Sequence, residues 1–211
     1  MKFKDTKYGD LTGQIYDDDI DVRGLGLTSL EGSPKEVYGY FDCSNNQLTS
    51  LEGSPKKVHG SFYCYTNKLT TLKNSPKVIY RHFDCTENKL LSLEGAPKIV
   101  NGYFDCSVNQ LTTLKGAPEV VGGYFDCSDN NLISLKGSPE VVGNSFDCHS
   151  NRLTSLEGSQ KEIHGSFDCS YNKINIDSLK YINLRYDKIE SDFSESELID
   201  YFSKHFPERL V

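Results

Sequence analysis

The sequence predicts a β-solenoid, a fold in which one short coil of chain is stacked repeatedly on the one before. Three observations lead to this fold class. Seven cysteines stand 21 residues apart, from Cys43 to Cys169. Phenylalanine keeps the same interval two places before each cysteine, and asparagine keeps it three places after. Three residue types held at one period indicate that each repeat forms one coil, with the same contacts as its neighbours.

Each repeat reads as a short strand followed by bends. In Phe41–Cys43, apolar, polar and apolar residues alternate, which is typical of a strand with one buried face. Val37, Leu48 and Leu51 are expected to turn further side chains inward, and Gly-Ser-Pro at 53–55 bends the backbone. A repeat of 21 residues leaves no room for a long helix, so the side opposite the strand is expected to be extended or a short 3-10 turn.

The period divides the chain into three parts. Residues 1–19 are expected to form an N-terminal cap over apolar side chains that the first coil would otherwise expose. Residues 20–174 form the solenoid, with one degenerate repeat and seven repeats of 21 residues. Residues 175–211 are expected to form a shortened coil and a C-terminal capping helix. The candidates to cover the N-terminal end are Phe3, Tyr8, Leu11 and Ile15, and the shortened coil would use Leu179, Ile182, Leu184, Tyr186 and Ile189.

The C-terminal helix has a recognisable start. Ser194 and Glu197 have the spacing of a capping box, and Phe193 with Leu198 that of a hydrophobic staple. Pro207 is expected to end the helix. Its apolar face would consist of Leu198, Ile199, Phe202 and Phe206.

The repeat pattern, Val-x-x-x-Phe-x-Cys-x-x-Asn-x-Leu-x-x-Leu, resembles the leucine-rich repeat. It is most similar to the short bacterial subclass found in secreted effectors, and its near-identical repeats also resemble proteins of bacteria and phages. The resemblance covers Ile20 to about Ile174 and departs at the phenylalanine and cysteine positions, where leucine is usual. It implies an α/β-class solenoid, a curved right-handed coil with a parallel sheet on its concave side and an irregular or 3-10 convex side. It also implies that the asparagine amides satisfy backbone groups inside the bend.

Composition narrows the function classes. The net charge of −7 argues against direct binding to the phosphate backbone of nucleic acids. The absence of an 18-residue apolar run argues against a membrane-spanning segment. The cysteines form one column without a Cys-x-x-Cys pair, so we expect buried, reduced thiols and a cytoplasmic protein. Nothing in the sequence calls for a cofactor or a metal.

The polar strand positions should point out of the concave sheet and form the candidate partner-binding surface. Its residues are Tyr40, Asp42, Tyr63, Tyr65, His82, Asp84, Tyr103, Asp105, Tyr124, Asp126, Asp147, His149 and Asp168. The aspartate column is either a solvated by-product of repeat copying or an acidic strip for a basic surface. A calcium site is less favoured, because one line of carboxylates does not wrap an ion. Tyr63 and Tyr65 interrupt the copied pattern and are the expected hot spot.

These features favour a non-enzymatic module that binds a protein partner with a basic surface. The resemblance implies a bacterial or phage-encoded inhibitor or effector of a host protein. One alternative is an acidic nucleic-acid mimic that occupies a basic groove. An enzyme or its regulatory subunit is less favoured, because the histidines are scattered and no nucleophile has a partner at defined spacing. A separate column, Val78, Ile99, Val120 and Val141, is expected to be secondary core packing, with a second interface or a dimer stripe as alternatives.

Overall fold

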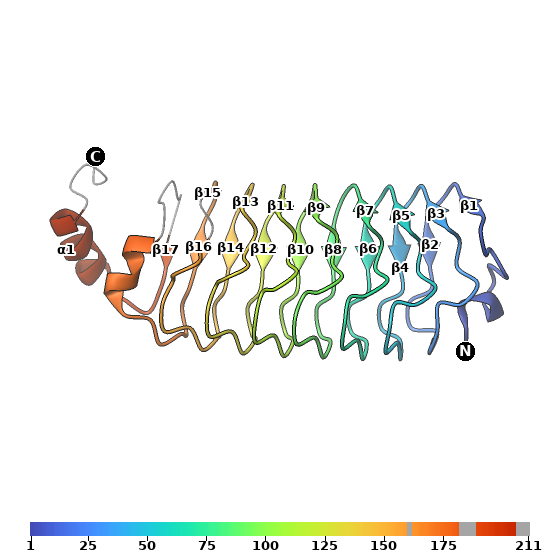
Figure 1. Cartoon of the computed structure of the whole chain (residues 1–211), viewed down its shortest axis with the longest axis horizontal. Coiled ribbons are helices and arrows are strands. Elements are labelled where there is room, and N and C mark those ends of the chain that lie inside the picture. Colours follow the sequence, from blue (N-terminus) through green and yellow to red (C-terminus); the bar gives the residue numbers. More distant parts are fainter. Residues whose placement is uncertain (160–161, 182–188, 206–211) are drawn as a thin grey trace.

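The computed structural model describes residues 1–159, 162–181 and 189–205 and confirms a parallel β-solenoid. Within the described residues one sheet has nine strands and the other has eight, and Figure 1 shows the coils stacked in a nearly straight row. The nine-stranded sheet contains β2 (Ile20–Asp21), β4 (Phe41–Asp42), β6 (Phe62–Tyr63), β8 (Phe83–Asp84), β10 (Phe104–Asp105), β12 (Phe125–Asp126), β14 (Phe146–Asp147), β16 (Phe167–Asp168) and β17 (Ile189–Glu190). The eight-stranded sheet contains β1 (Ile15–Tyr16), β3 (Glu36–Val37), β5 (Lys57–Val58), β7 (Val78–Ile79), β9 (Ile99–Val100), β11 (Val120–Val121), β13 (Val141–Val142) and β15 (Glu162–Ile163).

Both sides of each coil between β1 and β16 are therefore extended and paired with a neighbouring coil. In the nine-stranded sheet Phe104 is in register with Phe125, and in the other sheet Val100 is in register with Val121. Parallel strands have the same spacing in the two sheets, so the two sides of the row are equally long. The row therefore has no concave and no convex side. We therefore name the two surfaces by their sheets, as the nine-stranded face and the eight-stranded face.

A stack of phenylalanine rings fills the core. Between Phe41 and Phe167 successive ring centroids lie 5.0–5.7 Å apart, and all of these rings are fully buried. Phe3, in the 3-10 turn η1 (Phe3–Asp5), stacks on Phe41 at 6.0 Å and covers the open end as expected. Ile15 does not contribute, because it occupies an outward position of β1 and is 57% exposed.

The asparagine column closes the bend of every coil. The Asn109 Oδ1 accepts the Leu90 N–H at 3.0 Å, and its Nδ2 donates to Cys85, Cys106 and Ser107 carbonyl oxygens at 3.1–3.2 Å. These partners lie in two coils, so the amide both holds its own bend and ties it to the preceding coil. The expected structural role of this column is confirmed.

The residue before each asparagine has a left-handed backbone. At these positions φ lies between 49° and 54°, although none of them is glycine. Such a backbone costs an ordinary residue about 1–2 kcal/mol, and it is least suited to a β-branched side chain. Val108 is the most unfavourable occupant, whereas Asn45 holds the same position in the first full repeat.

Replacing Val108 by asparagine should therefore stabilise the protein. The Val108 side chain is 46% exposed, so little packing is lost, and the free energy of unfolding should rise by about 1 kcal/mol. Thermal unfolding should show a midpoint about 2–4 °C higher. The control Val78→Asn, at an exposed strand position with ordinary φ, should lower the midpoint, because asparagine is unfavourable in strands. Equal shifts in the two variants would contradict the argument.

The seven cysteines are buried and unpaired, as the sequence predicts. Several donate weakly to a carbonyl oxygen of the next coil, as Cys106 Sγ does to Asp126 O at 3.1 Å. Burial raises the pKa of these thiols, so the reactive thiolate is disfavoured.

Folded protein should therefore react slowly with a thiol reagent. In denaturant without reductant, all seven thiols should react promptly, because none is held in a disulfide. Mass spectrometry after timed labelling counts the modified cysteines in each state. Rapid labelling of several cysteines in the folded protein would contradict the buried column.

The C-terminal end is closed by the 3-10 helix η2 (Ile176–Tyr181) and the helix α1 (Glu195–His205), which lies beyond the last strand in Figure 1. The capping box is confirmed, since Ser194 N–H donates to Glu197 Oε2 at 2.8 Å and Glu197 N–H donates to Ser194 Oγ at 3.4 Å. Ile199 was expected on the apolar face but is 51% exposed, and Tyr201 is buried instead. Leu198 and Phe202 pack against the core as expected. Ile182, Leu184, Tyr186, Phe206 and Pro207 lie outside the described residues.

The column of valines and isoleucine was expected to be secondary core packing, and this expectation is wrong. Val78 and Ile99 are 41% and 54% exposed, and Val120 and Val141 are half-buried. All four lie at outward positions of the eight-stranded sheet.

Among the described helices, none is long and apolar enough to span a membrane.

Candidate functional site

The predicted surface residues lie on the nine-stranded face in adjacent coils. Twelve of the thirteen are half-buried, and Asp42 is only 4% exposed. Strand pairing brings Asp84, Asp105, Asp126, Asp147 and Asp168 side by side in one ladder. The surface is thus continuous, with its side chains held partly in the protein.

Hydrogen bonds within each repeat explain the aspartate column. Asp105 Oδ1 accepts the Ser107 N–H at 3.0 Å and the Ser107 Oγ–H at 2.7 Å. The same pair of bonds joins Asp42 to Ser44, Asp84 to Thr86, Asp126 to Ser128 and Asp168 to Ser170. Each aspartate therefore fixes the bend that follows its strand. Neither interpretation from the sequence included this role, which is structural and needs no partner.

The same ladder has unusual proton affinity. Burial raises the pKa of Asp42, Asp84 and Asp147. Burial and the neighbouring Asp105 carboxylate raise the pKa of Asp126 from 3.8 to about 6. A carboxyl group whose folded-state pKa lies above its unfolded value costs stability as the pH rises between the two values. Asp126 thus destabilises the folded protein at neutral pH while its Oδ1 holds the local bend.

Asp126→Asn separates the charge from the hydrogen bond. An amide oxygen can still accept from Ser128, so at about pH 7.5 the variant should be more stable by about 1 kcal/mol, after allowance for solvent screening. This advantage should disappear near pH 4, where the aspartate is already protonated. Urea unfolding at the two pH values measures both effects. Asp126→Ala, which also removes the acceptor, should be destabilising; an equal loss in the asparagine variant would contradict the assignment.

The aromatic residues of the same face form a stacked ladder. His82 and Tyr103 have ring centroids 4.1 Å apart, and Tyr103 and Tyr124 have theirs 4.6 Å apart, with nearly parallel planes. His82 Nδ1 accepts the Tyr103 N–H at 3.1 Å, so the neutral ring carries its proton on Nε2. Burial and the Arg81 charge lower the pKa of His82, which favours this neutral form. The three rings are held in fixed positions.

Repeat two departs from its neighbours as the sequence indicates. Tyr63 and Tyr65 replace the aspartate and serine, so the local hydrogen bonds of the other coils are absent there. Tyr40 and Tyr63 approach with ring centroids 6.3 Å apart. A pocket of about 450 Å³ opens beside them, lined by Asp19, Tyr38, Gly39, Tyr40, His59, Gly60, Ser61, Tyr63, Arg81 and His82.

A second aromatic ladder reaches this pocket through Tyr38 and His59 and was missed from the sequence. Tyr38 stacks on His59 at 4.3 Å, and His59 stacks on Tyr80 at 5.0 Å. The three residues are 21 positions apart and follow the strands of the eight-stranded sheet. Their spacing was the available signal, but it required knowing that the residue after each Val or Ile points outward.

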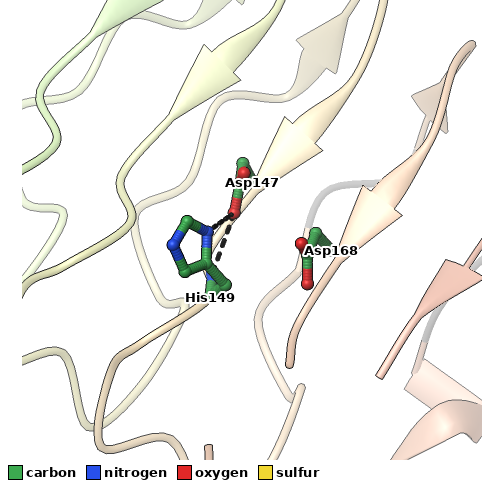
Figure 2. Close-up of side chains that lie close together, drawn as sticks. All are labelled: Asp147, His149 and Asp168. Atoms are coloured by element: carbon green, nitrogen blue, oxygen red, sulfur yellow. Dashed lines mark hydrogen bonds and ion pairs between the residues drawn. The ribbon is translucent and has the colours of Figure 1, made fainter. Parts of the chain in front are cut away.

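Asp147, His149 and Asp168 are the cluster that most resembles a metal site in the described residues (Figure 2). Their candidate ligand atoms lie within 4.8 Å of one another. His149 donates its N–H to Asp147 Oδ1 at 2.9 Å and places Nδ1 2.7 Å from the same oxygen, so it replaces the serine of other repeats. Burial opposes the charged ring, but the bond to Asp147 and nearby carboxylates raise the pKa of His149. Three half-buried donors on one surface fall short of the ligand sets of structural zinc or calcium.

No protein-family model matches the chain, and no curated protein matches its sequence. We therefore infer the function from the surface residues.

Proposed function

We propose that the nine-stranded face binds a protein partner with a basic surface, without catalysing a reaction. The proposal is carried by the composition of three adjacent columns on this face. From Tyr40 to Ser170, the positions before phenylalanine, between phenylalanine and cysteine, and after cysteine hold no lysine or arginine. They hold tyrosine, histidine, aspartate and small hydroxyl residues instead. An unbroken acidic and aromatic strip complements a cationic surface.

The aromatic ladder supports binding on energetic grounds. Tyrosine offers a large contact area and a hydrogen-bonding hydroxyl, and it is enriched at binding hot spots. Stacking between His82, Tyr103 and Tyr124 immobilises the rings before a partner arrives. Less side-chain entropy is then lost on association. The pocket beside Tyr40 and Tyr63 provides a recess into which a partner side chain fits.

We further infer a solenoid of the leucine-rich-repeat type that acts in the cytoplasm. The asparagine amides bond in the manner expected for that family, and seven free thiols suit a reducing compartment. The repeat pattern resembles bacterial and phage proteins, so an inhibitor or effector of a host protein is the natural form of this function.

The binding proposal is tested by capturing partners from host lysate and then measuring affinity for the captured protein. Tyr63→Ala combined with Tyr65→Ala should weaken binding at least tenfold, because tyrosines at a hot spot contribute about 1–2 kcal/mol each. Stability should change little, because both side chains are half-exposed and lack the local bonds of an aspartate. Calorimetry or surface plasmon resonance measures the affinity.

The matched control is Tyr181→Ala, which removes an exposed tyrosine from the C-terminal 3-10 helix η2, away from the candidate surface, and should leave binding within about twofold. Unchanged binding in the double variant would place the partner elsewhere on the molecule. Capture of DNA-binding proteins alone would favour imitation of nucleic acid over the broader proposal.

A further inference from the structure

Four adjacent coils present an exposed patch on the eight-stranded face, opposite the candidate site. Each coil contributes three exposed or half-buried positions: one just before the strand, one at its start, and one just after it. We call this surface the central patch. Its residues are Lys77, Val78 and Tyr80; Lys98, Ile99 and Asn101; Glu119, Val120 and Gly122; Glu140, Val141 and Gly143.

Charge changes sign halfway along the central patch. The column before the strands holds Lys77 and Lys98 in the first two coils and Glu119 and Glu140 in the last two. All four residues are exposed. Lys98 and Glu119 meet at the change of sign, with Nζ and Oε1 2.8 Å apart. The patch is therefore positive at one end and negative at the other.

Side-chain size also changes halfway along the patch. The column after the strands holds Tyr80 and Asn101, then Gly122 and Gly143. Tyr80 is 45% exposed and projects at one end, whereas the two glycines leave the other end low. Between these columns runs the aliphatic stripe of Val78, Ile99, Val120 and Val141.

These two gradients make the patch complementary to itself. A two-fold axis parallel to the strands, placed between the second and third coils, reverses the order of coils but keeps each column opposite its own copy. Lys77 then faces Glu140 of the other copy, and Lys98 faces its Glu119. Tyr80 lies over Gly143, and the aliphatic stripe covers itself. All three columns match in this single arrangement, as an isologous contact requires.

We propose that a second copy of this chain docks on the central patch, with the two solenoids antiparallel and their eight-stranded sheets face to face. Parallel strands about 4.8 Å apart give four coils a length of roughly 20 Å. A contact of this length buries less surface area than a standard stable interface. The dimer is therefore weak, with a dissociation constant in the micromolar range or above. The two nine-stranded faces point away from each other and remain accessible.

Sedimentation velocity over about 5–500 µM protein tests for the dimer. The expected result for the wild type is a concentration-dependent shift from monomer to dimer. Ile99→Lys should raise the dissociation constant roughly 100-fold, because the dimer carries the change twice at its centre. The variant should fold, because Lys57 occupies the equivalent position of another coil. The Tyr63→Ala and Tyr65→Ala variant, altered on the other face, should dimerise as the wild type does.

Charge reversal tests the antiparallel register. Lys77→Glu and Glu140→Lys should each weaken the dimer about tenfold, since each places like charges opposite each other at two symmetric places. The combined variant should recover most of the wild-type affinity. Within one chain these residues are three coils apart, roughly 14 Å, so recovery cannot come from an intramolecular pair.

Three results would overturn the proposal. The first is a monomer throughout the concentration range, and the second is a dimer that Ile99→Lys leaves intact. The third is a double charge reversal that shows no recovery after each single change has weakened the dimer, which would exclude this register. Glycine variants are unsuitable, because an added Cβ at Gly143 would collide with the Gly122 carbonyl oxygen.

Discussion

The asparagine amide is the contact on which the rest of this structure depends. In each coil it needs an N–H 19 positions earlier and carbonyl groups 24, 3 and 2 positions earlier. These requirements can be met together only when successive coils have the same length. A fixed coil length in turn places each phenylalanine on the phenylalanine of the preceding coil and keeps every surface column in register. A buried amide without partners is costly. The column of asparagines therefore strongly disfavours a shift of one coil by one residue against the next.

Much of the fold could be predicted because one period controls many residues at once. The phenylalanine stack, the thiol column and the asparagine bonds all follow from identical neighbours at identical spacing. The cap at Phe3 and the box at Ser194 were also recognisable, because both depend on local sequence. Ile15 and Ile199 were misplaced, since an apolar residue near an end gives no indication of which way its strand or helix faces.

The candidate site was located from sequence but only partly understood. The sequence shows the aspartates as a column and predicts either a solvated by-product of repeat copying or an acidic strip for a basic surface. Their bonds to the residue two positions later depend on backbone angles after the strand, which the sequence pattern does not display. The His82–Tyr103–Tyr124 stack was likewise invisible as a stack, because equal spacing says that rings are neighbours but not that they lie parallel. The role of His149 became clear only in the structure, where it bonds to Asp147 in the way that serine bonds to aspartate in other repeats.

The stacking of coils also makes length a variable that evolution can adjust separately from shape. Each coil contacts only the coils beside it, so duplicating one would lengthen the rod by about 4.8 Å and leave the others unchanged. The change from lysine to glutamate between Lys98 and Glu119 marks the centre of the patch on an otherwise repetitive rod. A duplication outside the four central coils would extend both faces and preserve that mark. One inside them would move the two halves of the pattern apart, so growth of the rod is expected toward its ends.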